Sequence, residues 1–324
     1  MAAVVLQRYK QTLHPALLKA LRRTEDGAQA PFFMEVFMFW QTTRFRIDLA
    51  QPQVMGIVNV TPDSFSDGGQ HASTHQALAH CEQLLKDGAH ILDIGGESTR
   101  PGAPAVSLEN ELARVLPVVR EAVCLNVPVS VDTYKAEVMQ AVLDAGADII
   151  NDVWALRQKG AQQVVAAHPS CGVCLMHMHG EPQTMQTLPM QGSITHPVSA
   201  FLMRHAQALQ TSGVAHERIV LDPGVGFGKT VVQNFELLAN QSQLQSLGHP
   251  VLVGWSRKSS IGAVTGCDVG ERMVPSVAAA LLAVERGARI VRVHDVAQTI
   301  QALKVWQAAQ PSLRQCLSSG SNQK

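Results

Sequence analysis

The chain has 324 residues, of which 46% are hydrophobic and 16% charged, and its 26 basic and 26 acidic side chains leave a formal net charge of zero. This length and apolar content suit one large or two ordinary globular domains. The balanced charge gives no reason to expect nucleic acid or an anionic membrane as a partner, and no apolar run is long enough to span a bilayer. We therefore expect a cytoplasmic protein.

Residues 1–37 fit the rest of the chain poorly. A basic stretch from Tyr9 to Arg23 is followed by a glycine- and proline-containing segment and an apolar cluster. We predict an N-terminal extension here: either the natural chain starts at Met38, or the segment is a short appendage packed on the domain that follows. That domain is expected to begin with a small hairpin strand at Arg44–Asp48 that closes its floor.

From Val54 onward, short apolar runs alternate with segments of helical periodicity. The first run lacks polar alternation, as expected of a strand buried on both faces. Helices are expected to start at Ser73 and Ser107, and strands to span 54–60, 90–96, 128–133, 148–153, 171–178, 218–221, 250–255 and 290–294. Eight strand–helix pairs over about 250 residues predict a (β/α)8 barrel of the α/β class, with a doubly wound sheet as the alternative. We assign 38–310 to this single domain and 311–324 to a disordered tail.

Three of these units share one local pattern. A helix ends at a glycine, alanine follows, and a polar residue comes five positions after the glycine, on the strand. More generally, polar residues mark the carboxyl ends of the predicted strands: Asn59, Asp132, Asn151, Asp222, Ser256 with Lys258, and Arg292 with His294. Because the strands of a barrel end at one mouth, we expect these side chains to converge there. Taken singly, Asn59 could be a buried amide bonded to backbone, Asp132 a helix N-cap, and Arg292 with His294 a solvated strand end.

Seven motifs resemble, in order, those of dihydropteroate synthases: Val58–Gly68, Asp93–Gly102, Val131–Lys135, Ile150–Val153, Leu221–Lys229, Ser256–Ser259 and Arg292–Asp295. The resemblance runs from about Met38 to about Trp306, and the chain is identified as a member of this family. It implies a pterin-binding barrel that joins 6-hydroxymethyl-7,8-dihydropterin pyrophosphate to 4-aminobenzoate, forming 7,8-dihydropteroate and pyrophosphate. It also implies Mg²⁺, a homodimer, and sulfonamides as inhibitors that mimic aminobenzoate. Where the family often has glutamine, this chain has His179.

The resemblance divides the strand-end residues into groups with distinct roles. The pterin would be held by Asp132, Asn151, Met176, Asp222, Phe227 and Lys258. The mixed acceptors and donors in this group suit the polar edge of a pterin ring. The aminobenzoate pocket would comprise Phe65, Thr99, Arg100, Pro101 and Ser256.

Pyrophosphate would be held by Asn59, Thr99, Arg292 and His294. A guanidinium can grip a phosphate through two N–H groups, and the neutral oxygen of Asn59 suits a Mg²⁺ that keeps most of its waters. The residues expected to act in catalysis are Asp132, Asp222, Lys258, Arg292 and His294. The mechanism implied is an SN1-like displacement in which the pyrophosphate leaves before the amine attacks.

Other interpretations explain less of this pattern. A corrinoid-dependent methyltransferase shares the pterin-binding barrel but does not need both loop motifs, and an inactive paralogue is expected to have lost loop residues. A phosphosugar barrel does not account for the pterin group. The segment Asp222–Thr230 lacks the spacing of a phosphate-binding P-loop. Cys171 and Cys174 form a C-x-x-C motif, but along a predicted strand they point to opposite faces, so we expect no redox pair. Phe65 and Pro101 are retained, which predicts sulfonamide sensitivity.

Overall fold

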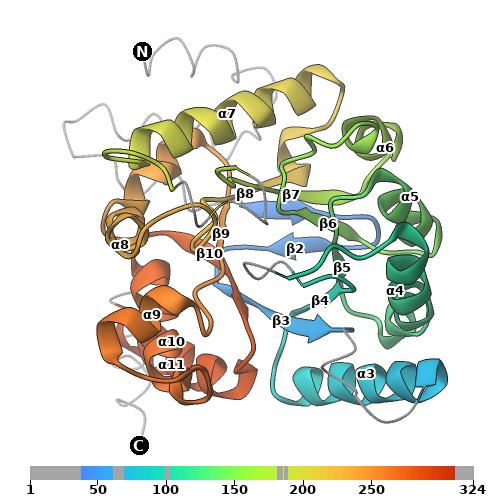
Figure 1. The fold of residues 1–324 in the computed structure, drawn as a ribbon, viewed down its shortest axis with the longest axis horizontal. Coiled ribbons are helices and arrows are strands. Elements are labelled where there is room, and N and C mark those ends of the chain that lie inside the picture. Colours follow the sequence, from blue (N-terminus) through green and yellow to red (C-terminus); the bar gives the residue numbers. More distant parts are fainter. Residues whose placement is uncertain (1–37, 61–68, 99–102, 181–184, 186–188, 311–324) are drawn as a thin grey trace, which may run out of the picture. The chain divides into compact units, whose positions relative to one another are not determined.

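The computed structural model describes residues 38–60, 69–98, 103–180, 185 and 189–310 (Figure 1). Met38–Lys324 forms one compact unit, and a second unit, Met1–Phe37, lies outside the described residues. The predicted extension and tail therefore fall outside the described part, and the proposed domain boundaries stay predictions. So do the placements of four loop residues expected in the site, Phe65, Thr99, Arg100 and Pro101.

Eight parallel strands close into a barrel in the order β10-β3-β4-β5-β6-β7-β8-β9. They are β3 (Gln53–Asn59), β4 (Ile91–Gly95), β5 (Val129–Asp132), β6 (Ile149–Asp152), β7 (Gly172–Met176), β8 (Ile219–Asp222), β9 (Val251–Val253) and β10 (Ala288–Val293). The last strand pairs with the first, with Val291 opposite Val54. The predicted (β/α)8 barrel is thus confirmed, and a doubly wound sheet is excluded because such a sheet leaves its outer strands unpaired.

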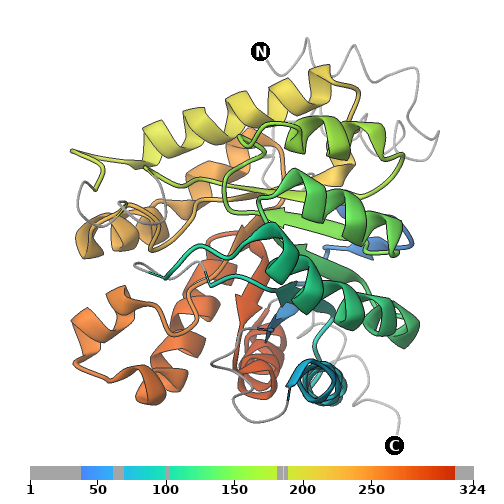
Figure 2. The ribbon, with the colours of Figure 1, turned by 45° about the vertical axis from the view of Figure 1, so that its right-hand side comes forward.

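Helices surround the barrel on its outside, as Figure 2 shows. Ser107 caps α4 as predicted, its Oγ accepting the Asn110 N–H at 3.3 Å, but α3 begins at Gly69 and not at Ser73. The predicted start at Ser73 is therefore wrong by one turn, because a serine followed three residues later by glutamine can also lie inside a helix and does not fix where it begins. The helices are α3 (Gly69–Lys86), α4 (Leu108–Ala122), α5 (Ala136–Asp144), α6 (Ala161–Ala167), α7 (Thr195–Thr211), α8 (Val231–Ala239), α9 (Ser259–Thr265), α10 (Met273–Glu285) and α11 (Val296–Ala309).

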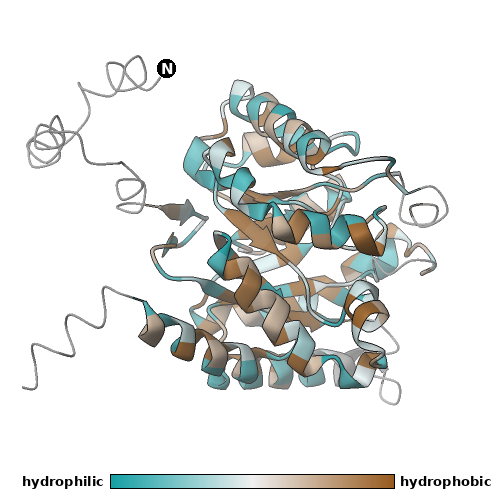
Figure 3. Ribbon diagram, turned by 90° about the vertical axis from the view of Figure 1, so that its left-hand side faces the viewer, coloured by the Kyte–Doolittle hydropathy of each residue, from teal (hydrophilic) through white to brown (hydrophobic). Residues whose placement is uncertain are grey.

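Two apolar cores result from the alternation of side chains along the strands. One core fills the space between strands and helices, and the other fills the barrel interior. Figure 3 shows the apolar strands enclosed by helices with one polar face. Cys171 belongs to the outer core and Cys174 to the inner one, and both are free thiols. The expectation that these two cysteines face apart is confirmed.

The floor of the barrel is closed by the predicted hairpin, built from β1 (Phe39–Gln41) and β2 (Arg46–Asp48) as an antiparallel pair. Trp40 is completely buried in the inner core, and its indole N–H donates to the carbonyl oxygen of Arg218 at 2.9 Å. Gly172 is required for this closure, because an added Cβ would lie 2.9 Å from the Trp40 indole nitrogen. The hairpin therefore acts as a plug and leaves the opposite end of the barrel for chemistry.

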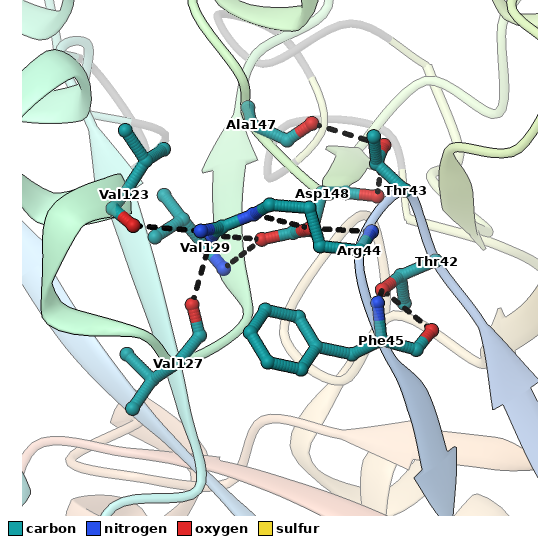
Figure 4. Close-up of polar contacts among 9 residues, drawn as sticks. All are labelled: Thr42, Thr43, Arg44, Phe45, Val123, Val127, Val129, Ala147 and Asp148. Atoms are coloured by element: carbon teal, nitrogen blue, oxygen red, sulfur yellow. Dashed lines mark hydrogen bonds and ion pairs between the residues drawn. The ribbon is translucent and has the colours of Figure 1, made fainter.

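An ion pair between Arg44 and the buried Asp148 fastens the hairpin (Figure 4). Asp148 Oδ1 accepts from the Arg44 backbone N–H and Nε at 3.0 and 3.1 Å. Its Oδ2 accepts from Arg44 Nη2 at 2.7 Å and from the Val129 N–H at 2.9 Å. The guanidinium also donates to the carbonyl oxygens of Val123 and Val127. Each oxygen of the buried carboxylate thus has two donors, which compensates its desolvation.

No helix in the described part of the chain is long and apolar enough to cross a membrane.

Candidate active site at the barrel mouth

The strand-end residues do converge at one mouth. Asp132 ends β5 and lies beside Asn151 of β6, while Asp222 ends β8 and lies beside Met176 at the end of β7. Asn59 ends β3 and is half-buried. This arrangement follows from the parallel register, because the carboxyl ends of all eight strands face the same way.

Arg292 of β10 is the centre of the polar network. Its Nε donates to Asp93 Oδ2 at 2.6 Å and its Nη2 to Asp132 Oδ2 at 2.9 Å. Asn151 Nδ2 donates to the same Asp93 oxygen at 3.3 Å. The arginine predicted to hold pyrophosphate is therefore bonded to an aspartate predicted to hold the pterin, so the two groups form one continuous network.

Asp93 is a site residue that the strand-end criterion missed. It lies two residues before the end of β4 and is completely buried. Its Oδ1 has no hydrogen-bond partner among the described residues, although a buried acceptor of this kind normally has one. The internal repeat contained the signal, since Asp93, Asn151 and Arg292 each follow a helix-ending glycine by five positions.

Asp132 is buried, and this burial raises its pKa to about 7, against the lowering effect of the Arg292 charge. The alternative that Asp132 caps the next helix is excluded, because α5 begins at Ala136 with Lys135 at the N-cap. A carboxyl group that keeps so high a pKa beside an arginine is incompletely solvated. Groups of this kind concentrate at functional sites.

Asp222 is held in a similar state by the loop after β8. Its Oδ1 accepts the Gly224 N–H at 2.7 Å, while burial raises its pKa to about 6, opposed by this hydrogen bond and by the Lys258 charge. Gly224 has a φ of +68°, and an added Cβ would lie 1.9 Å from the His177 carbonyl oxygen. Only glycine fits this close approach between the loop and the residue that directly follows β7.

Lys229 shows why the same loop is not a phosphate-binding P-loop. The residue is buried, and its Nζ donates to the carbonyl oxygens of Gly224, Phe227 and His177 at 2.7, 3.0 and 3.2 Å. Three backbone acceptors use its three donors. Lys229 therefore ties the loop together, and its ammonium group is already used by protein acceptors.

An apolar surface lies beside the network at the mouth. Met176 and Phe227 belong to one buried cluster with Val153, Met178 and Met185, flanked by Tyr134 and Trp154. Lys258 Nζ lies 4.3 Å from the centre of the Phe227 ring, within cation–π range. The structure thus brings together all six residues predicted for the pterin, with an apolar side and a polar side.

Ser256 and His294 are joined directly. Ser256 Oγ lies 3.0 Å from His294 Nδ1 and accepts the His294 backbone N–H at 3.1 Å. These contacts link the segments that follow β9 and β10. Ser256, expected at the aminobenzoate pocket, is therefore hydrogen-bonded to His294, expected at the pyrophosphate.

A second ion-pair cluster, which the motif analysis did not single out, fixes the segment after β4. Lys135 bridges Glu97 and the buried Glu111, and Tyr134 donates its hydroxyl proton to Glu97 Oε1 at 3.0 Å. Arg114 Nη1 donates to the Gly96 carbonyl oxygen at 2.8 Å. These bonds position the chain directly before Thr99.

The residues present fit a divalent cation only if phosphate oxygens and water supply most of its ligands. The described residues contain no cluster of three or more histidine, cysteine, aspartate or glutamate side chains that could hold a metal ion. His177 packs edge-on against Phe201 with ring centres 4.8 Å apart, and burial lowers its pKa to about 2. Asn59 offers one neutral oxygen, which suits a Mg²⁺ carried mainly by phosphate oxygens and water.

Comparison with known proteins gives matches over most of the chain. A family model described as "Pterin binding enzyme" matches residues 55–294. A dihydropteroate synthase of Neisseria meningitidis serogroup C is 52% identical over 273 residues, covering 83% of this chain and 96% of the relative. The crystal structure of Burkholderia cenocepacia dihydropteroate synthase complexed with 7,8-dihydropteroate is 50% identical with a TM-score of 0.78, covering 86% of this chain and 99% of that one. Yersinia pestis dihydropteroate synthase in a sulfonamide drug complex is 45% identical with a TM-score of 0.79, covering 84% and 98%.

Proposed function

We infer, since the chain belongs to the dihydropteroate synthase family of pterin binding enzymes, that the network around Arg292 is where this protein performs the family reaction. That reaction condenses 6-hydroxymethyl-7,8-dihydropterin pyrophosphate with 4-aminobenzoate and releases pyrophosphate. The observation that carries the assignment to this site is the pair of buried carboxyl groups on one arginine, of which Asp93 keeps an oxygen with no hydrogen-bond partner among the described residues. Such a set is costly unless a polar ligand completes it.

The pterin lies with its polar edge against Asp132, Asn151 and Asp222. The carboxylates accept from the ring N–H and NH₂ groups, and the Asn151 amide can both donate and accept. Met176 and Phe227 pack on the ring face from the apolar cluster. Asp93 completes the group, because its unpartnered Oδ1 is an acceptor for a ligand donor or an ordered water.

Pyrophosphate is bound by Arg292, His294 and Asn59. Two of the five N–H donors of Arg292 bond the aspartates, and the others can serve the phosphate oxygens. A Mg²⁺ bound with the substrate would supply positive charge to the leaving group, with Asn59 as its protein ligand. Lys258 lies within the electrostatic reach of Asp222 and adds a second cation.

The residues explain a dissociative displacement. The C–O bond to pyrophosphate breaks, and the charge left on the oxygen is taken up by Arg292 and His294. The methylene carbon becomes cationic and shares its charge with the pterin ring, which the negative charges of Asp132 and Asp222 stabilise. The amine nitrogen of 4-aminobenzoate then bonds to the methylene carbon and releases one proton to the solvent. No protein nucleophile is needed, so positioning supplies much of the rate.

The aminobenzoate pocket comprises Ser256 with four residues outside the described part, Phe65, Thr99, Arg100 and Pro101. Retention of Phe65 and Pro101 supports sulfonamide inhibition, and a similar protein from Yersinia pestis has been crystallised with a sulfonamide. The working unit is a cytoplasmic homodimer. Exposed apolar side chains on α10, Val274 and Leu282, support an interface on that helix.

A product assay tests this function. Purified protein is mixed with the dihydropterin pyrophosphate, 4-aminobenzoate and Mg²⁺, and dihydropteroate and pyrophosphate are followed by chromatography. Product that requires all three additions and is lost in Asp222→Ala is expected. Absence of product with retained pterin binding would point instead to a pterin-binding methyltransferase or an inactive paralogue, and corrinoid binding would separate those two.

A further inference from the structure

Arg257 lies between two residues of the site, Ser256 and Lys258, in a backbone conformation that is unusual for its type. Its φ of +57° is in the left-handed region, which is unfavourable for any residue with a Cβ. Such backbone persists only where the surroundings hold it, and it concentrates at functional sites. The contacts of Arg257 show what holds it.

The backbone of Arg257 is bonded on both sides to the start of α10. Its N–H donates to Ser276 Oγ at 2.9 Å, and its carbonyl oxygen accepts from Arg272 Nη1 at 3.3 Å. Arg272 is itself fixed against α9, because an added Cβ on Gly262 would lie 2.2 Å from Arg272 Nη2. The turn that carries Ser256 and Lys258 is therefore held against the start of α10 through the backbone of Arg257.

The side chain of Arg257 reaches across to the next strand end. Its Nη2 lies 2.6 Å from Asp295 Oδ1 and its Nε 3.2 Å from Asp295 Oδ2, a bidentate ion pair. Asp295 follows His294 directly, and His294 is bonded to Ser256. Two successive residue pairs, Ser256–His294 and Arg257–Asp295, thus join the ends of β9 and β10.

We propose that Arg257 is a positioning residue for the condensation, in which its ion pair with Asp295 fixes the Ser256–Lys258 turn against His294. The hydroxyl of Ser256, the ammonium of Lys258 and the imidazole of His294 then face the substrates in one arrangement. The inference rests on the proposed function of these three side chains and adds a residue that acts only through them. Stability is a poor alternative explanation, because the Arg257 side chain is 39% exposed and exposed ion pairs stabilise little. Bidentate pairing contributes geometry in addition to energy.

Three variants test the role of this ion pair. Glycine adopts a φ of +57° without a steric penalty, so Arg257→Gly removes the ion pair while leaving the backbone conformation allowed. Asp295→Asn removes the same pair from the other side. We expect each variant to lower kcat about 10- to 100-fold, the size of effect that small misplacements produce, with little change in Tm. The double variant is expected to lose no more than either single variant, because both remove one interaction.

Arg44→Lys is the matched control, because it breaks the bidentate pair at the floor. We expect it to lower Tm and leave kcat unchanged. The imidazole NMR signals of His294, assigned with His294→Gln, give a readout that needs no turnover: they should move in Arg257→Gly and Asp295→Asn and stay in place in Arg44→Lys. Wild-type kcat and unmoved His294 signals in Arg257→Gly, or additive losses in the double variant, would overturn the role of Arg257. Wild-type protein that makes no dihydropteroate would instead overturn the proposed function, while the NMR comparison would still decide whether the pair fixes His294.

Discussion

The two ends of the barrel each contain a buried aspartate paired with an arginine, and the two pairs are built differently. At the floor, both oxygens of Asp148 have two donors each. At the mouth, Asp93 has one oxygen bonded twice and one with no partner among the described residues. Burial also raises the pKa of Asp132 at the mouth to about 7. A complete set of bonds stabilises the fold, whereas an incomplete set leaves polar groups for a ligand.

The largest expected effect is that of Arg292→Ala on catalysis. It removes the charge that we propose for the leaving group, and it leaves Asp93 and Asp132 without their shared cation. We expect kcat/KM to fall by about 10³-fold, as for loss of a principal transition-state donor. Steady-state kinetics measures this, with circular dichroism to confirm folding. Activity within tenfold of wild type would mean that the mouth pair, like the floor pair, is only structural.

Asp148→Ala should lower the stability of the fold and leave catalysis unchanged. It leaves part of the Arg44 guanidinium and the Val129 N–H without an acceptor at the floor. Because the Arg44 side chain is 31% exposed, we expect a loss near the low end for buried pairs, about 3 kcal/mol in the free energy of unfolding. Urea titration measures it. The kcat of the folded fraction should equal that of wild type, and a reduced kcat would show that the two ends are coupled.

Binding of a pterin ligand at the mouth should raise the free energy of unfolding whether or not the ion pair at the floor is intact. A pterin ligand at 100 times its Kd is expected to add about 2.7 kcal/mol to the free energy of unfolding. The same increment should appear in Asp148→Ala, because its mouth is intact, and should be absent in Asp222→Asn at the same concentration. Thermal unfolding with and without ligand measures both. An equal increment in Asp222→Asn would show that this carboxylate does not bind the pterin.

The pH dependence tests the carboxyl groups of the mouth without any substitution. Burial raises the pKa of Asp132 from 3.8 to about 7 and that of Asp222 to about 6. Between these values and 3.8, the folded protein keeps protons that the unfolded chain has lost. The free energy of unfolding without ligand should therefore decrease as pH rises from about 4 to about 7.

The catalytic rate should change in the opposite direction over this range, because both carboxylates must be charged to stabilise the cation. We expect kcat/KM to rise with pH and level off above about 7. Rate profiles and urea titrations at several pH values measure the two trends. A kcat/KM that is flat from pH 5 to pH 8 would exclude these aspartates as the titrating groups.

Local patterns in the sequence determined the strands of this protein and the polar residues at their ends. Short apolar runs between helical segments predicted all eight strands, and the polar residue at the end of a strand is placed at the mouth by the parallel direction alone, as for Asp132, Asn151 and Asp222. Motif order adds the chemistry. These features depend on residues a few positions apart, which is the range over which periodicity and strand direction act.

The tertiary structure decided which charges meet. Arg292 and Asp93 are 199 residues apart and become partners only when β10 closes on β3. The same holds for Arg44 with Asp148, 104 residues apart, and for Arg257 with Asp295. The sequence showed that each of these residues is polar and where its strand ends. The packing of the closed barrel determines whether a lysine or arginine donates its hydrogen bonds to a carbonyl oxygen, a carboxylate or a ligand. That is why Lys229 holds a loop together, Arg44 fastens the floor, and Arg292 bonds two aspartates with only part of its guanidinium.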